Sequence, residues 1–318
     1  MSYLPCELHC HTVHSDGDFS VKQLQTDAAN DHIALIALTD HNTFSGCDEL
    51  DDGIVPAIHG IEWTTYFGHM LVLGAQEFVD WRDAVPDNID KKIKAVKAVG
   101  GLVGVAHPFQ LGSPMCTGGR WEFNVRDWRS VDYMEIWHQE FSFDNYENDR
   151  AVELWTSLLD KGYKIGAVYG RDWHRPDGEN AGHFGCTYVD IDGEVNQKNA
   201  LSAIRMGKTV ASTGAKMFFR VHQRGRTYSI GETLRRGPAI FSFFIDLHAR
   251  RKNSGSEDVE YKTIKLITNG GECIMESALT ERHIRVDLRR NHWYRAELWG
   301  TVSGVEKPLA ITSPIYTY

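Results

Sequence analysis

Residues 4–17 read LPCELHCHTVHSDG, and they predict a short strand that ends in paired histidines and runs into a turn. Side chains two residues apart on a strand project to the same face, so His9 and His11 point together while Cys10 points away. Two imidazoles fixed on one face can ligate a single metal ion. Asp16 lies on the following turn, where its carboxylate can reach the same ion or a neighbouring one. The stretch therefore predicts a metal site at the carboxyl end of the first strand.

The chain up to residue 213 alternates between apolar, strand-like segments and helix-like segments. Strands are expected at 4–11, 33–38, 54–61, 69–74, 102–106, 131–137 and 165–169. Helices are expected at 21–31, 88–99, 145–161 and 197–206. Repeated strand–helix alternation is typical of an α/β fold in which parallel strands are joined by crossover helices. Polar residues recur where these strands end, which is where the active sites of parallel barrels form.

The pattern changes near residue 214. Residues 214–318 contain short alternating runs, turn signals such as Asn269-Gly270-Gly271, and no convincing helix pattern. We therefore expect two domains, an α/β domain over residues 1–213 and a small antiparallel β-sandwich over residues 214–318.

Composition excludes several classes of partner. The chain has 318 residues and a formal net charge of -9, which argues against binding the phosphate backbone of duplex nucleic acid. No apolar run is long enough to cross a bilayer, so no interaction with a membrane is expected. His9 leaves no room for a cleaved signal peptide ahead of it, and the six cysteines are scattered without a Cys-x-x-Cys pair. These features predict a cytoplasmic protein.

Histidines and acids concentrate at the predicted strand ends. They are His9, His11, His41, His69, His107, His138 and His174, with Asp16, Asp40, Glu62 and Asp172 beside them. Imidazole and carboxylate ligands together suit Zn, Mn or Fe better than Ca or Mg. One ion needs fewer ligands than this, so we expect two or three divalent transition metal ions, with a carboxylate bridging two of them.

Five short motifs, taken in order, resemble the polymerase and histidinol phosphatase (PHP) domain. They are His-x-His-Thr-x-x-Ser-Asp-Gly at 9–17, Thr-Asp-His at 39–41, Gly-Ile-Glu at 60–62 with His-x-Leu-x-x-Gly at 69–74, Ala-His-Pro at 106–108 and Gly-x-Asp-x-His at 170–174. The match spans about residues 1–213. The sequence at 60–69 and the β-rich tail are similar to the carbaryl-hydrolase-like branch of that superfamily.

The resemblance implies a distorted (β/α)7 barrel with a trinuclear metal centre. It implies a first ion held by His9, His11, Glu62 and Asp172, a second held by Glu62, His69 and His107, and a third held by Asp16, His41 and His174. It further implies a metal-dependent phosphoesterase that attacks its substrate with a metal-bridging hydroxide. The expected partner is a small, anionic molecule, and assembly into a homo-oligomer stays open.

Three more residues are candidates for catalysis. Asp40 and His138 are alternative proton donors to the leaving group, and Arg171 is a candidate for neutralising charge in the transition state. Each has a plainer alternative: Asp40 as a support for a neighbouring ligand, His138 as an ordinary strand-end histidine, and Arg171 as half of a salt bridge. Trp137-His138 stands where related domains usually carry an asparagine or an arginine-containing loop, which weakens the case for phosphate monoesters.

Two other functions fit the same residues. One is hydrolysis of a carbamate, ester or amide on the same metal centre, which the carbaryl-hydrolase-like resemblance suggests. The other is a non-catalytic, metal-stabilised binding module whose β-sandwich holds a partner. The apparently complete set of ligands argues against the second, because inert relatives are expected to lose several of them. Histidinol phosphatase itself fits less well, because of the C-terminal extension.

Overall fold

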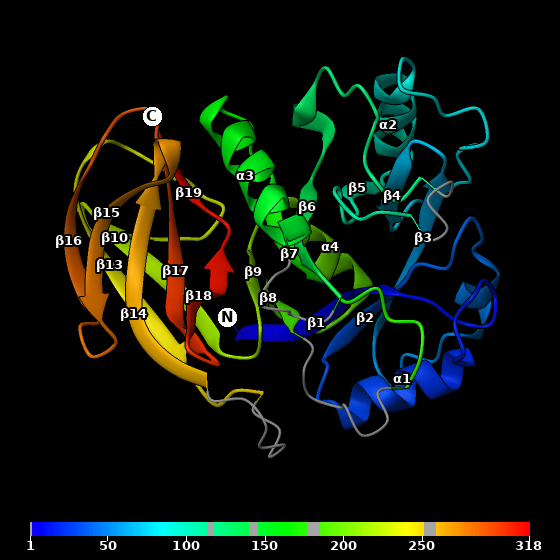
Figure 1. Ribbon diagram of the computed structural model, residues 1–318, viewed down its shortest axis with the longest axis horizontal. Helices are drawn as coiled ribbons and strands as arrows, with labels where there is room; N and C mark the ends of the chain where they lie inside the picture. Colours follow the sequence, from blue (N-terminus) through cyan, green and yellow to red (C-terminus); the bar gives the residue numbers. More distant parts are fainter. Residues whose placement is uncertain (1, 113–117, 140–145, 177–184, 251–258) are drawn as a thin grey trace.

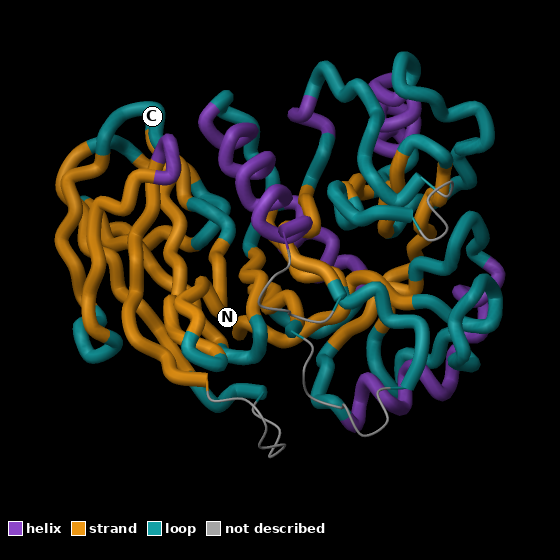
Figure 2. The backbone as a smooth tube through the Cα atoms, viewed as in Figure 1, coloured by secondary structure: helices purple, strands orange, loops and turns teal. Residues whose placement is uncertain are grey.

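The computed structural model describes residues 2–112, 118–139, 146–176, 185–250 and 259–318. The chain is a mixed α/β protein with a large sheet and few helices, and its helices gather in the N-terminal part (Figures 1 and 2). The α-helices of the described residues are α1 (Val21–Asn30), α2 (Ile89–Ala98), α3 (Tyr146–Asp160) and α4 (Gln197–Arg205). Their positions match the four helices expected from the sequence, although Asn145, where the third was expected to begin, lies outside the described residues.

Seven consecutive strands form the part of the sheet that carries the candidate site. They are β1 (Ser2–Cys10), β2 (Leu35–Leu38), β3 (Ala57–Thr65), β4 (Gly68–Leu73), β5 (Leu102–Val105), β6 (Tyr133–His138) and β7 (Gly166–Gly170), adjacent in that order. Most neighbours are parallel, as expected. The strand β4 is antiparallel to both β3 and β5, because a tight turn after Thr65 sends the chain straight back along β3.

The expected seven-fold repeat of strand and helix is not confirmed. A 3₁₀ helix, η1 (Ser45–Glu49), joins β2 to β3, and β3 and β4 form a hairpin with no helix between them. The ladder of paired strands ends at β7, and β1 continues on its other side to β8 (Cys186–Ile191) as an antiparallel partner.

The seven strands nevertheless curl so that the segment after β7 meets the carboxyl end of β1. The backbone N–H of His11 donates to the carbonyl of Trp173 at 2.9 Å, and the N–H of Trp173 donates to the carbonyl of His9 at 3.0 Å. This parallel bridge joins the first motif to the segment that follows β7. Residues far apart in sequence are thereby held side by side.

Local sequence signals explain the helices that cover this sheet. The side chain of Ser20 accepts a hydrogen bond from the backbone N–H of Gln23 and caps α1, which buries Val21, Leu24 and Ala28. In α3 the ring of Trp155 is buried, and its indole N–H donates to the carbonyl of Ile165, at the start of β7, at 2.8 Å. Both helices therefore fix the strands that lead into the candidate site.

The C-terminal part consists of two facing layers of strands, which are antiparallel except for the parallel pair of β12 and β19. One is a four-stranded sheet of β11 (Arg226–Ser229), β10 (Lys216–Gln223), β13 (Gly237–Asp246) and β16 (His283–Leu288). The other holds β14 (Val259–Thr268), β15 (Glu272–Ala278), β17 (Trp293–Val302), β18 (Val305–Thr312), β19 (Ile315–Thr317) and β12 (Thr233–Leu234). Side chains of both layers share one apolar cluster, which includes Phe219, Phe241, Leu266 and Leu298.

The second layer is continuous with the large sheet, because β18 pairs with β9 (Thr209–Ser212). The division expected at residue 213 falls between β9 and β10, and it stays a prediction. Of the six cysteines, Cys116 lies outside the described residues, and the other five are free thiols. Among the described residues, no helix has the length and apolar character that crossing a membrane would require.

Candidate metal centre

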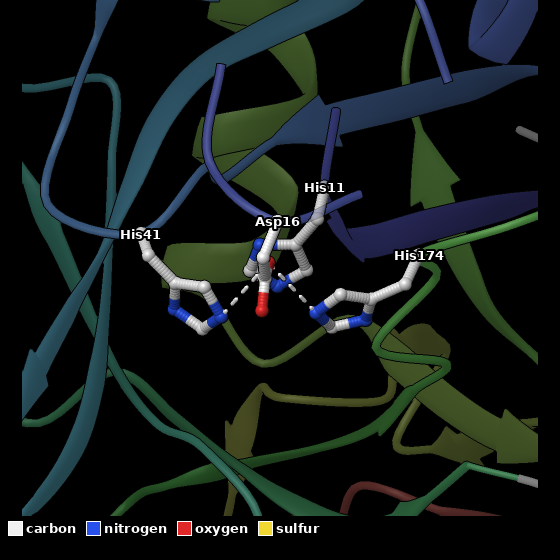
Figure 3. A group of neighbouring side chains, drawn as sticks. All are labelled: His11, Asp16, His41 and His174. Atoms are coloured by element: carbon white, nitrogen blue, oxygen red, sulfur yellow. Dashed lines mark ion pairs between the residues drawn. The ribbon is translucent and has the colours of Figure 1, made fainter. Parts of the chain in front are cut away.

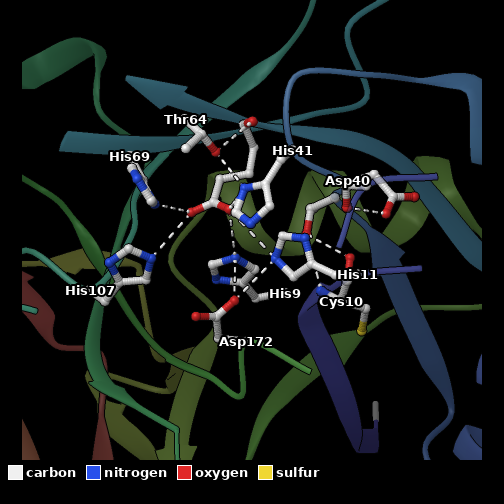
Figure 4. A network of polar contacts seen from close by, with 12 residues as sticks. His9, Cys10, His11, Asp40, His41, Thr64, His69, His107 and Asp172 are labelled. Carbon is white, nitrogen blue, oxygen red and sulfur yellow. Dashed lines mark hydrogen bonds and ion pairs between the residues drawn. The ribbon is translucent and has the colours of Figure 1, made fainter. Parts of the chain in front are cut away.

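The nine ligands expected from the sequence lie together at one end of the curled sheet. Figure 4 shows six of them, namely His9, His11, His41, His69, His107 and Asp172. His9 is on β1, Glu62 is on β3 and His69 is on β4. The other six lie on segments that follow a strand: His11 and Asp16 after β1, His41 after β2, His107 after β5, and Asp172 and His174 after β7. Their ligand atoms form three overlapping groups that could hold a metal ion, and His9 and His107 form a fourth such group with Glu135.

The first group is His9, His11, Glu62 and Asp172, and it is deeply buried. The Nε2 atom of His9 lies 3.3 Å from Asp172 Oδ1 and 3.4 Å from Glu62 Oε2. The Nε2 atom of His11 lies 3.0 Å from the same Asp172 oxygen and 3.5 Å from the same Glu62 oxygen. Tetrahedral ligands with metal–ligand bonds of about 2.1 Å are separated by roughly 3.4 Å, so these spacings suit one shared ion.

These four ligand atoms make no hydrogen bond of acceptable geometry to any described residue. They are His9 Nε2, His11 Nε2, Glu62 Oε2 and Asp172 Oδ1. Leaving four convergent polar atoms buried without a hydrogen bond is costly, and a cation among them removes that cost. The donor set of nitrogen and oxygen therefore fits a divalent transition metal ion.

Glu62 lies at the centre of the cluster, and each of its two carboxylate oxygens faces histidine side chains. Its Oε1 atom lies 2.9 Å from His69 Nδ1 and 3.2 Å from His107 Nε2, which completes the second group. Its Oε2 atom faces the first group and also lies 2.8 Å from His41 Nδ1. Burial alone would raise the pKa of Glu62, but the surrounding imidazoles outweigh it and hold that pKa well below its usual value. Glu62 thus belongs to both buried groups of ligand atoms.

The third group is the most exposed of the three, and Figure 3 shows how its side chains converge on Asp16. Asp16 Oδ1 lies 3.2 Å from His174 Nε2 and 3.4 Å from His41 Nε2, and the ring of His11 stacks against His174 with centroids 4.1 Å apart. The contacts with His174 and His41 hold the pKa of Asp16 far below its usual value. The side chain of Asp16 is 60% exposed, whereas those of Glu62 and His9 are fully buried, so this group forms the open side of the centre.

Two buried carboxylates behind the ligands were not expected from the sequence. Glu135 on β6 contacts His9 Nδ1 at 2.8 Å and accepts a hydrogen bond from the backbone N–H of His107 at 2.9 Å. Glu7 on β1 accepts hydrogen bonds from the backbone N–H groups of His9 and Arg171 at 3.2 and 3.1 Å. Burial raises the pKa of Glu7 to about 7. The only available signal was an acid inside an apolar strand, which is too common a pattern to single out either residue.

Asp40 lies under the loop that carries Asp16. Its carboxylate accepts three hydrogen bonds, each of 2.7 Å, from the backbone N–H of Thr12, the hydroxyl of Thr12 and the hydroxyl of Ser15. The group is 1% exposed. This geometry favours the support role over the role of proton donor, because both oxygens are engaged as acceptors.

The arginine candidate points away from the ligand cluster. The guanidinium of Arg171 stacks 3.8 Å from the centroid of the Trp173 ring and lies 3.6 Å from Asp31 Oδ2. It is 4% exposed, so this packing favours the salt-bridge alternative over a contact with substrate.

His138 lies beside the cluster, with its ring centroid 5.7 Å from that of His107. Asn148 Oδ1 accepts from the backbone N–H of His138 and lies 3.0 Å from Nδ1, so Nδ1 carries the proton when the ring is neutral. Burial, helped by the neighbouring charge of His107, lowers the pKa of His138 to about 4. The ring is therefore neutral near pH 7, with the Nε2 lone pair available as an acceptor.

Comparisons with known proteins agree with the fold. No family model and no curated protein matches the sequence. The structure is similar to a two-domain protein from Bacteroides vulgatus that contains a predicted PHP-like metal-dependent phosphoesterase, with 15% identity, a TM-score of 0.55, and coverage of 97% of this chain and 95% of that one.

Two weaker similarities cover about half of the chain. One is to a putative metal-dependent phosphoesterase from Bifidobacterium adolescentis, at 19% identity and a TM-score of 0.36, covering 53% of this chain and 87% of that one. The other is to an amidohydrolase from Chromobacterium violaceum, at 17% identity and a TM-score of 0.38, covering 56% and 90%. Over nearly its whole length, this chain shares the fold of the Bacteroides vulgatus protein.

Proposed function

We propose that this protein is a metal-dependent hydrolase that cleaves phosphoesters at a centre of two or three divalent transition metal ions. The observation that carries the proposal is the convergence of four buried ligand atoms, from His9, His11, Glu62 and Asp172, that make no hydrogen bond to a described residue. Such a set is stable only around a positive charge. The fold shared with a PHP-like protein agrees with this function.

In this proposal His9, His11, Glu62 and Asp172 hold the first ion, and Glu62, His69 and His107 hold the second. Asp16, His41 and His174 hold a third, with His11 close by. Zn, Mn and Fe are the metals that suit these ligands. Bound ions would act as Lewis acids, lowering the pKa of water to near neutrality and neutralising charge on the substrate.

The chain's own residues would fix the positions of the metal ligands and the side from which the substrate enters. Glu62 holds ligands of both buried groups in one place through its two oxygens. The exposed third group gives an anionic substrate its access, because the other two groups are covered. His138 would accept or relay a proton through Nε2 at the edge of the cluster. We further propose that residues 1–213 form the catalytic domain, with a barrel-like arrangement of strands, and that residues 214–318 support it.

The test compares His9→Ala with His59→Ala. His59 is an exposed histidine on the same strand as Glu62, so its loss controls for general damage to β3. Both purified proteins, loaded with Zn²⁺ or Mn²⁺, would be assayed on aryl phosphate mono- and diesters and on aryl carbamates. We expect phosphoester turnover in the wild type and in His59→Ala, and a loss of at least about 100-fold in His9→Ala, since a deleted ligand costs several kcal/mol of transition-state stabilisation.

Other outcomes would reject the proposal. Turnover of carbamates alone would favour the carbamate, ester or amide hydrolase. Bound metal without turnover of any substrate would favour a binding module. Phosphoester turnover that survives in the double variant His9→Ala/His11→Ala would show that this cluster does not carry the activity.

A further inference from the structure

We propose that Glu135 is a positioning residue that fixes ligands of both buried metal groups at once, an inference that rests on the proposed function. Glu135 is on β6, belongs to none of the five motifs and is 1% exposed. One of its oxygens faces the ring of His9, and the other binds the backbone of His107. His9 is a ligand of the first group and His107 of the second.

The contact with His9 selects one form of its ring. A carboxylate accepts hydrogen bonds and does not donate them, so Nδ1 of His9, at 2.8 Å from Glu135 Oε1, carries the proton. The Nε2 atom of His9 is then left with its lone pair, and it points toward Asp172 and Glu62 at 3.3 and 3.4 Å. An imidazole held in this way is both oriented and made a stronger ligand.

The contact with His107 acts on the backbone. His107 has φ of 22°, an unfavourable value for a residue with a side chain. The N–H of His107 donates to Glu135 Oε2 at 2.9 Å, which holds this strained turn after β5. The backbone of this turn determines the position of the His107 ring, whose Nε2 atom lies 3.2 Å from Glu62 Oε1. One carboxylate therefore determines the ring of one ligand and the backbone of another.

Gly170, at the end of β7, leaves the space that this carboxylate occupies. A Cβ atom added at Gly170 would overlap the carboxylate of Glu135. Any other residue at position 170 must therefore push the carboxylate away from His9. The glycine of the Gly-x-Asp-x-His motif is therefore required because it leaves space for Glu135, and not because of its backbone conformation.

The decisive variant is Glu135→Gln. A glutamine has one acceptor oxygen, so it can satisfy either the His9 ring N–H or the His107 backbone N–H, but its NH₂ group opposes the other donor. Metal-stripped full-length protein would be titrated with Zn²⁺ against a competing chelator. We expect the ions of the two buried groups to bind about 10- to 100-fold more weakly than in the wild type, the usual effect of losing such a partner.

A second readout separates positioning from a general loss of stability. Co²⁺ bound in place of Zn²⁺ absorbs visible light according to its ligand geometry, so a reoriented His9 changes the spectrum of the bound ions. A purely structural role would lower the unfolding temperature of the metal-free protein and leave the spectrum of the bound ions unchanged.

Glu7→Gln is the matched control. Glu7 is also a buried acid behind the centre, but both of its backbone hydrogen bonds go to one oxygen, Oε1, which a glutamine retains. We expect Glu7→Gln to bind Zn²⁺ like the wild type. Equal weakening in Glu7→Gln and Glu135→Gln would overturn the proposal, because any buried charge would then have the same effect.

Gly170→Ala tests the same contact with Glu135 still present, and it serves if Glu135→Gln does not fold. We expect Gly170→Ala to reproduce the weaker Zn²⁺ binding and the altered Co²⁺ spectrum. In the double variant Glu135→Gln/Gly170→Ala, we expect Zn²⁺ binding to be little weaker than in Glu135→Gln alone. Wild-type affinity in Glu135→Gln, or in Gly170→Ala where that variant is the one that folds, would overturn the proposal. That failure is distinct from failure of the proposed function, which shows itself in a wild-type protein that binds no metal or hydrolyses no phosphoester.

Discussion

The carboxylate of Asp40 holds Thr12 by two hydrogen bonds of 2.7 Å, one to its backbone N–H and one to its hydroxyl. Thr12 opens the turn that delivers Asp16 to the exposed side of the centre, and the same carboxylate also holds Ser15. Asp40, which follows β2, therefore holds this turn in place through its side chain.

This relationship separates the two roles considered for Asp40. We expect Asp40→Ala to reduce turnover by about 10- to 100-fold and to destabilise the fold by about 1–3 kcal/mol, because it leaves the donors of Thr12 and Ser15 without their acceptor. Asp40→Asn should restore most of both, since an amide oxygen accepts from Thr12 and Ser15. An amide cannot act as a general acid, so an Asn variant as inactive as the Ala variant would support the proton-donor role instead. Steady-state kinetics and urea unfolding measure the two effects.

Arg171 is expected to contribute to stability and not to substrate affinity. Its guanidinium stacks on Trp173 and lies near Asp31, away from the ligand cluster. Arg171→Gln should lower the free energy of unfolding by about 1–2 kcal/mol, the range for a desolvated cation–π contact. The KM for a phosphoester should change less than about threefold, which corresponds to less than about 0.7 kcal/mol of binding free energy.

Arg175→Gln provides a control for Arg171→Gln, because Arg175 is 78% exposed and its nearest carboxylate oxygen, on Asp18, is 4.0 Å away. It should change neither quantity. A large rise in KM for Arg171→Gln without loss of stability would return Arg171 to the list of groups that contact substrate.

His138 makes the metal-free protein sensitive to acid. Its pKa is lowered to about 4 by burial, below the value of about 6.5 in an unfolded chain. Between these two pH values the unfolded state binds more protons than the native state, so stability falls as the pH drops from about 6.5 to about 4. We expect His138→Gln to lose less stability than the wild type between pH 7 and pH 5, measured by urea unfolding in the presence of chelator. Identical losses in both proteins would contradict the buried, neutral state of this ring.

Removing metal should destabilise the protein through Glu62. The bound ions stabilise the native state by mass action, and the ligand cluster without them leaves charged groups buried. We expect Zn²⁺ to raise the unfolding temperature of chelator-treated wild type by several degrees, since about 1–3 kcal/mol corresponds to that shift in a protein of this size. Glu62→Gln should lose most of the increase.

Glu49→Gln is the control for Glu62→Gln. The side chain of Glu49 is 57% exposed and its partner is His14, outside the ligand groups, so its response to Zn²⁺ should equal that of the wild type. If Glu62→Gln also responded like the wild type, Glu62 would not be a metal ligand.

Much of the strand pattern could be read from the sequence, and the structure shows why some of it could not. Continuous apolar runs such as Ile33–Leu38 correctly predicted buried strands, because only a strand covered on both faces has no polar side. The reversal of β4 was missed, since the turn between Thr65 and Gly68 is short and its direction is not encoded in the hydrophobic pattern. The four helices read from the sequence are present, but the seven-fold repeat of strand and helix that the resemblance implied is not confirmed, because β3 and β4 form a hairpin without a helix between them.

The sequence by itself determined which residues carry the ligand chemistry. Pairs two residues apart, as in His9 and His11, and acids placed where strands end are local properties that a strand converts directly into a shared face. Tertiary structure decided what those groups meet. The curl of the sheet brings Asp172 to His11, places both oxygens of Glu62 among the imidazoles, and sets Glu135 behind His9. The same packing stacks Arg171 on Trp173 and lets Asp40 accept a hydrogen bond from Thr12. Neither contact could be read from the sequence, because the direction of a buried side chain depends on the space left by segments distant in sequence.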